Sequence, residues 1–221
     1  MPIMDDGSSR TAPVKPRERR ARQTRSTLLD AAVTVLRRVG FTATTMQLVI
    51  EEADVSRGAA LHHFPTRIDL FVAVAQHASE GQNAWVRRRL AGLPPGIDLY
   101  MAITEATWEA MMQPLGLALI EIICSARSDP QLSEALIAVV NDFENAQFEG
   151  VWEIAQVIGV KDREAIARMV RLNRAAMRGL AIEMMFCGDK RQVDGALQLL
   201  SEYKRFLSGW LLTNPDKALF G

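Results

Sequence analysis

The sequence of 221 residues contains only two cysteines, Cys124 and Cys187, which excludes the disulfide framework of a small secreted protein. Its first ten residues, MPIMDDGSSR, lack the apolar run of a secretory signal peptide. No stretch approaches the roughly 18 uninterrupted apolar residues of a membrane-spanning helix. An overall charge excess is also missing, because 26 basic residues balance 26 acidic ones. These absences favour a folded protein of a reducing compartment, expected to be cytoplasmic and without a membrane partner.

The sequence also lacks a recognisable catalytic motif. It has no phosphate-binding loop, no paired carboxylates in a known motif and no nucleophile elbow. His62 and His63 are adjacent, so on a helix their side chains point about 100° apart, and neither has His77 or a cysteine four residues away. We therefore expect no enzymatic activity, no cofactor and no metal site, and a helical enzyme is the least favoured class.

The basic residues are unevenly distributed along the chain. Residues 10–38 contain nine basic side chains and two acidic ones, Glu18 and Asp30, a net charge of +7. Such a cluster is either a solvated charged surface or a contact for a polyanion, a membrane or an acidic protein. Because residues 1–21 contain prolines, glycine and serines but few large apolar side chains, we predict that they form a flexible basic arm.

Turn and capping residues divide the segment after this arm into four helices. A first helix is expected from about Arg22 to Val39, with Gly40 placed to cap it. The residues expected to cap or end the next helices are Thr44 or Thr45, Asp54, Ser56, Pro65, and Thr66 with Asp69. A helix, a short helix, a tight turn and a second short helix are the parts of a helix-turn-helix DNA-binding domain, whose second short helix enters the major groove.

The stretch TTMQLVIEEADVSRGAALHHFPTRIDLF, residues 44–71, resembles the DNA-binding signature of the tetracycline-repressor (TetR) family of bacterial transcriptional regulators. The resemblance covers residues 22–82, with the helix-turn-helix motif at 45–64. It implies an all-α fold, in which this three-helix DNA-binding domain precedes a larger helical ligand-binding and dimerisation domain at residues 83–221. It also implies a ligand-responsive dimeric regulator, a repressor that releases a palindromic operator when it binds a small molecule.

Three positions depart from the family pattern: Asp54 stands where glycine is usual, Ala60 replaces a larger apolar residue, and Leu61 stands where tyrosine is usual. Asp tolerates a positive φ, but leucine cannot donate the hydrogen bond that a tyrosine gives to a phosphate. Helical periodicity places Ala60 and Phe64 inside and Arg57 outside, where Arg57 can reach a guanine or a phosphate. The residues expected to contact DNA are Thr45, Gln47, Ser56, Arg57, Gly58, Ala59, Leu61, His62, His63 and Arg67.

Proline, glycine and asparagine breaks predict helices over residues 67–90, 97–113, 114–125, 130–158, 162–186 and 191–212. The resemblance makes residues 162–187 and 191–212 the dimer interface. An apolar stripe on the last helix fits either this interface or the core, and consists of Leu197, Leu200, Phe206, Leu207, Trp210 and Leu211, with Tyr203 beside it. The candidate effector-pocket residues, each also suited to ordinary core, are Trp85, Trp108, Met111, Met112, Glu121, Phe148, Trp152 and Met184, with Met185 beside them.

Two further expectations concern the ligand and the switch. If one of Glu105, Glu109, Glu121 or Glu144 is buried in the pocket, a cationic effector is indicated. The helix at 67–90 is expected to be the one continuous rigid element that joins the two domains, so that its tilt sets the spacing of ~34 Å between two recognition helices. A second functional class stays open: a helical protein that binds small molecules or membranes and has no role in DNA binding. Salt-dependent binding to palindromic DNA separates the two classes.

Overall fold

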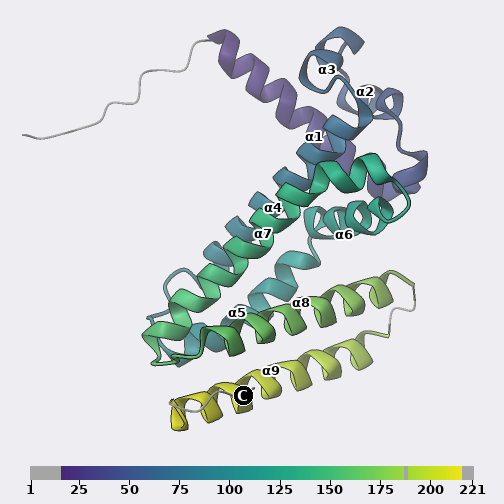
Figure 1. Cartoon of the computed structure of the whole chain (residues 1–221). Helices are drawn as coiled ribbons and strands as arrows, with labels where there is room; N and C mark the ends of the chain where they lie inside the picture. Colours follow the sequence, from purple (N-terminus) through teal and green to yellow (C-terminus); the bar gives the residue numbers. More distant parts are fainter. Residues whose placement is uncertain (1–15, 187–188, 216–221) are drawn as a thin grey trace, which may run out of the picture.

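The computed structural model describes residues 16–186 and 189–215, and within these ranges the chain forms nine α-helices and no strand. Figure 1 shows α1, α2 and α3 at one end of the molecule and α8 and α9 at the other, with α4 and α7 running between the two ends. The all-α fold is therefore confirmed. The helices are α1 Pro16–Ala43, α2 Met46–Ala53, α3 Arg57–His63, α4 Arg67–Leu90, α5 Ile97–Met111, α6 Pro114–Ala126, α7 Pro130–Val157, α8 Arg163–Phe186 and α9 Lys190–Thr213.

The first helix begins earlier than the sequence predicted. Helix α1 starts at Pro16, a residue type that suits a first helical position, so residues 16–21 are helical and do not belong to a flexible arm. The rest of the predicted arm, residues 1–15, lies outside the described residues. The early turns of α1 consequently carry basic side chains on a regular helix, all of them exposed: Arg17, Arg19, Arg20 and Arg22.

The capping residues of the next helices are where the sequence placed them. Thr45 caps α2 by accepting a hydrogen bond from the Leu48 amide at 3.3 Å, and Ser56 caps α3 by accepting one from Ala59 at 3.2 Å. Asp54 ends α2 in the left-handed conformation, with φ of 50°. Thr66 and Asp69 form a reciprocal capping box at the start of α4. Each cap satisfies backbone amides that a helix end leaves free, which fixes these helix bounds locally.

The later helices agree with the predicted bounds to within two residues, and α4 agrees at both ends. Between α5 and α6 the chain bends by 76°. Pro114 opens α6, and a Cβ on Gly116 would lie only 2.2 Å from the Met111 carbonyl oxygen, so this bend requires glycine. Among the described residues no single helix has the length and hydropathy to cross a membrane, and only the bent α5–α6 pair passes that test jointly.

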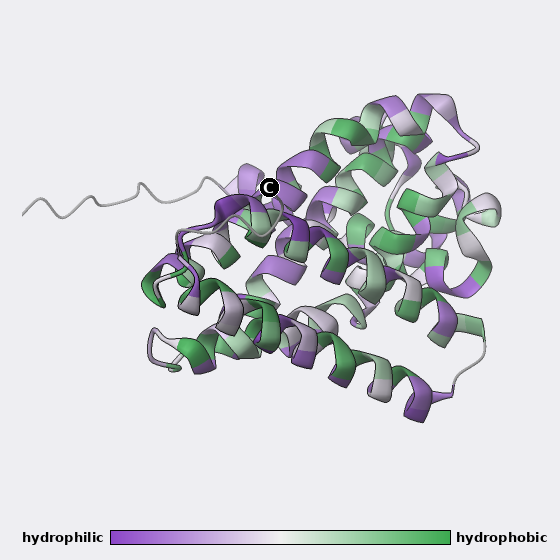
Figure 2. Ribbon diagram, turned by 60° about the horizontal axis from the view of Figure 1, so that its bottom comes forward, coloured by the Kyte–Doolittle hydropathy of each residue, from purple (hydrophilic) through white to green (hydrophobic). Residues whose placement is uncertain are grey.

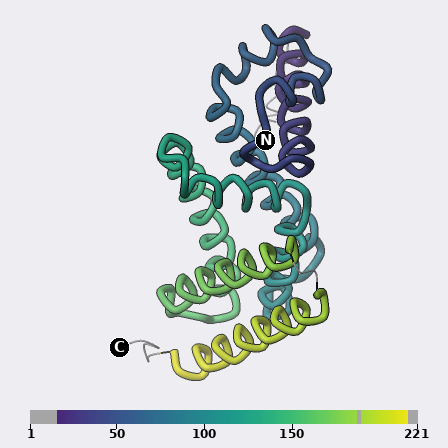
Figure 3. The backbone as a smooth tube through the Cα atoms, turned by 90° about the vertical axis from the view of Figure 1, so that its right-hand side faces the viewer, coloured from purple at the N-terminus to yellow at the C-terminus, as the bar shows by residue number. Residues whose placement is uncertain are grey.

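One core cluster joins the helix-turn-helix segment to the rest of the molecule. It contains buried side chains of α1 to α4 together with Leu119 and Ile122 of α6 and Leu132, Leu136 and Phe143 of α7. Two further clusters lie between α5, α6, α7, α8 and α9. Figure 3 shows the resulting elongated shape, with the helix-turn-helix segment at one end and the pair of C-terminal helices at the other. The predicted boundary at residue 82 therefore falls inside α4 and is crossed by continuous packing.

Candidate nucleic-acid interface and effector cavity

Helix α3 presents the side chains that the sequence assigned to its outer face. Ala60 and Phe64 are buried, whereas Arg57, Gly58 and His62 are exposed. Leu61, in place of the usual tyrosine, is 36% exposed beside them. A Cβ on Gly58 would meet no atom within 4 Å, so packing inside the chain does not require glycine there. The face that α3 turns to solvent thus combines one cation, one histidine and one apolar side chain around an open stretch of backbone.

The remaining predicted contact residues lie around this face. Thr45 and Ser56 are exposed but already use their hydroxyl oxygens as helix caps. Gln47 is exposed on the first turn of α2 and donates to Glu51 at 2.7 Å, and Ala59 is half-buried in the first turn of α3. Helix N-termini with free amides are suitable positions for phosphate groups. Figure 1 shows α2, α3 and the start of α1 at the same end of the molecule.

The two adjacent histidines have different surroundings. Their rings are 5.5 Å apart in an edge-on arrangement, and His63 also lies 6.3 Å from the Phe64 ring. Burial lowers the pKa of His63 first, and the nearby charges of His62 and Arg25 lower it further. In the described ranges, no group of three His, Cys, Asp or Glu side chains is arranged to hold a metal ion. His62 is thus available to solvent, and His63 supports the end of α3.

Arg67, predicted to contact a phosphate, makes several contacts inside the chain. Its guanidinium donates to the carbonyl oxygens of Thr44, at 2.8 Å, and of Phe41, and it lies against two neighbouring rings. The guanidinium carbon is 4.2 Å from the ring centroid of Phe41 and 4.7 Å from that of Phe71. These contacts hold the turn between α1 and α2 against the start of α4. Their cost is desolvation, which lowers the pKa of Arg67.

Glu121 also lies at this turn and not in an effector pocket. Its Oε1 accepts a hydrogen bond from the Phe41 amide at 2.6 Å, next to Gly40, whose φ of 79° kinks α1. Burial raises the pKa of Glu121, and the Phe41 hydrogen bond opposes that effect. Because Glu121 is on α6, this contact ties the larger helical body directly to the helix-turn-helix segment. The predicted exclusive role of α4 in joining the two parts is therefore wrong.

The principal cavity has a volume of about 600 Å³, and none of the predicted pocket residues lines it. Met111 and Trp152 are buried in core clusters, Trp108, Met112 and Phe148 pack against those clusters, and Trp85 and Met184 lie half-buried elsewhere, while Met185 is exposed. Large apolar side chains bury much surface when they pack in the core, as Met111 and Trp152 do here. Residues of α4, α5, α7, α8 and α9 line the cavity, and they include Asn83, Val86, Leu90, Leu99, Ile103, Thr104, Thr107, Gly150, Ile154, Met169, Asn173, Met177 and Lys204.

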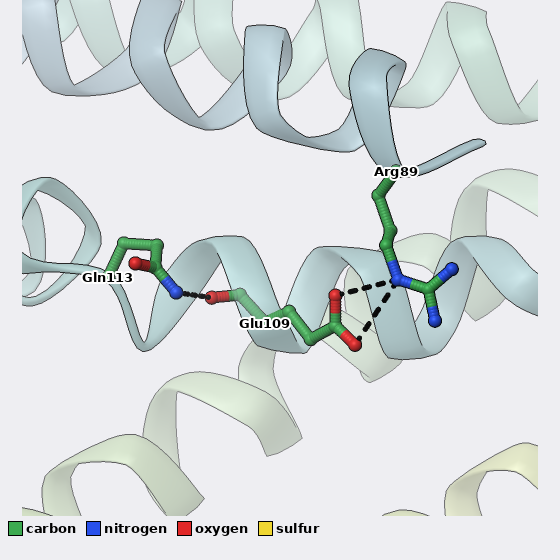
Figure 4. A network of polar contacts seen from close by, with 3 residues as sticks. All are labelled: Arg89, Glu109 and Gln113. Carbon is green, nitrogen blue, oxygen red and sulfur yellow. Dashed lines mark hydrogen bonds and ion pairs between the residues drawn. The ribbon is translucent and has the colours of Figure 1, made fainter. Parts of the chain in front are cut away.

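The four glutamates considered for a cationic ligand do not line this cavity. Glu109 accepts from the Arg89 Nε at 3.0 Å, while its backbone carbonyl accepts from Gln113 (Figure 4). Glu144 is paired with Arg174 at 2.7 Å and with Arg178 at 3.0 Å. Glu121 is at the turn described above, and Glu105 is exposed. The specific reason for expecting a cationic effector is thereby removed.

Sequence reasoning missed the most unusual residue of the cavity, Lys204. It is 1% exposed, and it lies four residues after Leu200 and three before Leu207, on the buried side of α9. A single lysine at helical spacing inside an apolar stripe was the available signal. The same stripe is mixed in its burial: Leu200, Leu207 and Leu211 are core residues, whereas Phe206 is 75% exposed.

Comparison with known proteins gives the family. Residues 28–74 match the model of the bacterial regulatory proteins of the tetR family. The chain is 30% identical over 177 residues to the HTH-type transcriptional regulator CymR of Pseudomonas putida, covering 79% of this chain and 86% of that protein.

Two solved structures share the fold. Salmonella enterica GusR aligns with a TM-score of 0.61 at 22% identity, covering 91% of this chain and 99% of that one. The TetR-like regulator LfrR of Mycobacterium smegmatis, in complex with proflavine, aligns with a TM-score of 0.56 at 21% identity, covering 81% and 95%. With its helix-turn-helix segment and its nine-helix fold over the described residues, this chain belongs to the tetR family of transcriptional regulators.

Proposed function

We propose that the protein is a dimeric repressor that binds a palindromic operator through α3 and releases it when a small molecule enters the cavity. The observation that carries this proposal is the course of α4. Asn83, Val86 and Leu90 of α4 line the cavity, and at the other end of the same helix Arg67 holds the turn that leads into α2. A ligand that favours a different tilt of α4 therefore changes the position of α3.

Two further contacts connect the cavity to the DNA-binding segment. Arg89, at the end of α4, is bound to Glu109 of α5, the helix that contributes Ile103 and Thr104 to the cavity (Figure 4). Helix α6 follows α5 through the sharp bend and reaches the start of the helix-turn-helix through Glu121 and Phe41. A displacement of α5 by a ligand would thus reach α1 and α2 by a second route. Binding of proflavine by LfrR is consistent with a ligand site in a protein of this fold.

The exposed face of α8 and α9 is the surface we assign to the dimer. Leu199, Tyr203 and Phe206 of α9 and Leu172 of α8 are exposed apolar side chains. Figure 2 shows apolar residues interspersed with polar ones along the helices of the molecule. Pairing this face about a two-fold axis would bury these side chains and give the symmetry that a palindromic operator requires.

The DNA-binding part of the proposal is tested by selecting bound sequences from random duplex DNA and measuring the affinity for the best sequence by fluorescence anisotropy. A palindromic consensus bound with strong salt dependence supports it. Binding without sequence preference contradicts it and favours a small-molecule-binding protein with no DNA role.

The dimer assignment is tested separately by sedimentation. Phe206→Asp is expected to give a folded monomer with greatly weakened operator binding, because it places a charge in the proposed interface. The matched control is Val157→Asp, at an apolar side chain that is 63% exposed at the end of α7. A Phe206→Asp variant that remains dimeric contradicts the assigned interface.

A further inference from the structure

The inner wall of the cavity holds a buried ammonium group without a counter-charge. The Lys204 Nζ donates to the Tyr100 carbonyl oxygen and to the Thr104 hydroxyl at 3.3 Å, and it lies 4.1 Å from the centroid of the Tyr100 ring. In residues 16–186 and 189–215, no carboxylate lies within ion-pair distance of it. Lysine is almost never fully buried unless it is paired, because taking an ammonium out of water is costly.

A second polar group on the same wall is also incompletely bonded. Asn173 of α8 is 9% exposed, lines the cavity, and its buried Oδ1 has no hydrogen-bond partner. Most buried side-chain polar atoms have a partner, so the side-chain amide of Asn173 is incompletely satisfied by the chain itself. Lys204 lies on α9 and Asn173 on α8, and both line this cavity.

The other charges around the cavity are already balanced or lie at its rim. Arg174 of α8 is paired with Glu144 at 2.7 Å. Glu149 of α7 is paired with Arg163 at 2.5 Å, and Glu153 and Arg87 have exposed side chains at the outer edge. Among the described residues that line the cavity, Lys204 is therefore the buried charge that lacks an opposite partner. The ionisable group of the cavity that lacks an opposite partner is thus a single lysine.

The rest of the inner wall is apolar. Ile103, Met169 and Met177 are buried side chains of the wall, and Leu90, Leu99 and Val170 are half-buried ones. A volume of about 600 Å³ lies within the range of sites for small organic molecules. The methionines give this wall side chains that adapt to irregular ligand shapes. The cavity therefore suits a compact apolar group with one polar end.

We propose that this cavity takes a monocarboxylate with a compact apolar body, whose carboxylate is held by Lys204 and Asn173 at the buried end. The remaining Nζ–H of Lys204 donates to one carboxylate oxygen. The Nδ2 of the Asn173 amide donates to the other. This inference rests on the proposed function, since it names the class of molecule that enters the regulatory cavity.

The protonation of Lys204 is consistent with such a ligand. Burial lowers the pKa of Lys204 to about 7, so a bound anion would raise it again and draw a proton from solvent. The charged groups lining the cavity from the neighbouring helices are Arg87 on α4, Glu149 and Glu153 on α7, and Arg174 on α8. Tyr100, which faces Lys204 from α5, keeps its proton because burial raises its pKa.

The test compares ligands of one shape and three charges by calorimetry on the full-length protein without DNA. The first series is octanoate, octanamide and octylammonium. The second is 3-phenylpropionate with its amide and its amine. We expect the carboxylate of at least one series to bind at least tenfold more tightly than its amide, and the ammonium compounds to bind more weakly still. Both carboxylates failing to bind at millimolar concentration would contradict the proposal, as would equal affinity for acid and amide.

The variant Lys204→Met tests whether Lys204 causes the preference for the carboxylate over its amide. The variant keeps the volume of the side chain, so it is expected to fold, which circular dichroism and thermal unfolding check. Its affinities for acid and amide should become equal within about twofold. Lys161→Met is the matched control, because Lys161 is an exposed lysine outside the cavity. This variant should keep the preference for the acid over the amide. A preference that persists in Lys204→Met overturns the assignment.

Failure of this inference and failure of the proposed function are distinguishable. If octanoate binds through Lys204 but leaves operator affinity unchanged, the carboxylate site stands and ligand-induced release is refuted. If a neutral or cationic compound releases the operator while the carboxylates do not bind, the release mechanism stands and the carboxylate site is refuted.

Discussion

The helix-turn-helix segment and the cavity satisfy their polar groups in different ways. In the former, Thr45, Ser56 and Thr66 each bond an amide three residues away, so local sequence completes every helix start. In the cavity, Lys204 reaches Thr104, 100 residues distant, and Asn173 keeps an unbonded oxygen. The helix starts of the helix-turn-helix segment are thus satisfied by residues of the chain itself. The cavity, in contrast, retains polar groups that a partner completes.

The largest expected effect is that of pH on the free energy of unfolding, and it arises from Lys204 in the cavity and not from the helix-turn-helix segment. The pKa of Lys204 in the folded protein is about 7, below its ordinary value of 10.5. Between these values the unfolded chain binds a proton that the native protein lacks, so the free energy of unfolding rises with pH through this window. A shift of this size corresponds to several kcal/mol at about 1.4 kcal/mol per pKa unit.

Lys204→Met should flatten this dependence, measured by urea unfolding at pH 7.0, 8.0 and 9.0. Keeping below pH 9.5 avoids the titration of Tyr100. Equal pH dependence in the variant and the wild-type protein would contradict the burial of an unpaired ammonium. Lys161→Met again provides the control, with no change expected.

A second large effect is expected at Arg67, where the segment meets α4. Arg67→Met removes the guanidinium donor from the Phe41 and Thr44 carbonyl oxygens, of which that of Phe41 still accepts from the Thr44 amide at 3.2 Å, and it removes the contact with two rings. We expect a loss of about 3 kcal/mol in the free energy of unfolding, measured in urea at pH 7.5. Arg57→Met, at an exposed arginine, should change stability by less than about 0.5 kcal/mol. Similar small losses in both variants would show that Arg67 does not hold the turn.

Arg57 is expected to affect DNA sequence preference rather than stability. Arg57→Ala should cost about 1 to 3 kcal/mol on the selected operator and relax the preference at one base pair. Arg20→Ala, in the exposed first turns of α1, should weaken binding to all sequences and reduce the salt slope by about 0.9. Competition against random DNA distinguishes them. Equal losses on operator and random DNA for Arg57→Ala would assign it to the phosphate backbone.

The smallest expected effect is a change in stability on substitution of Gly58. Because a Cβ there meets nothing within 4 Å, Gly58→Ala should stabilise the protein by up to about 0.8 kcal/mol. If the backbone of α3 approaches DNA closely at this point, the same substitution weakens operator binding. A variant that is more stable and binds the operator as tightly as the wild-type protein would refute the close approach.

The helices of this protein were predictable because their ends depend on neighbours in sequence. Ser56, Asp54 and the Thr66–Asp69 box fix the bounds of α2, α3 and α4 through contacts within four residues. Pro16 marks the start of α1 in the same way, and it was overlooked because the surrounding composition suggested a flexible arm.

The cavity was not predictable by the same reasoning. Trp152 and Met111 were candidates for the effector pocket because their side chains are large and apolar. Side chains of that kind also pack in the core, which is where both lie. The two carbonyl partners of Arg67 lie 23 and 26 residues away in the sequence, so no local pattern indicates these contacts. Lys204 did carry a signal, a charge at core spacing in an apolar stripe, yet its partners on α5 depend on tertiary packing.

The central claim is that the cavity and the operator site share one conformational equilibrium through α4, and a paired titration tests it most directly. The carboxylate that binds most tightly would be titrated into the protein with and without saturating operator DNA. We predict that operator weakens carboxylate binding by the same factor, about 5- to 150-fold, by which the carboxylate weakens operator binding. Identical carboxylate affinities in the two titrations would contradict the coupling.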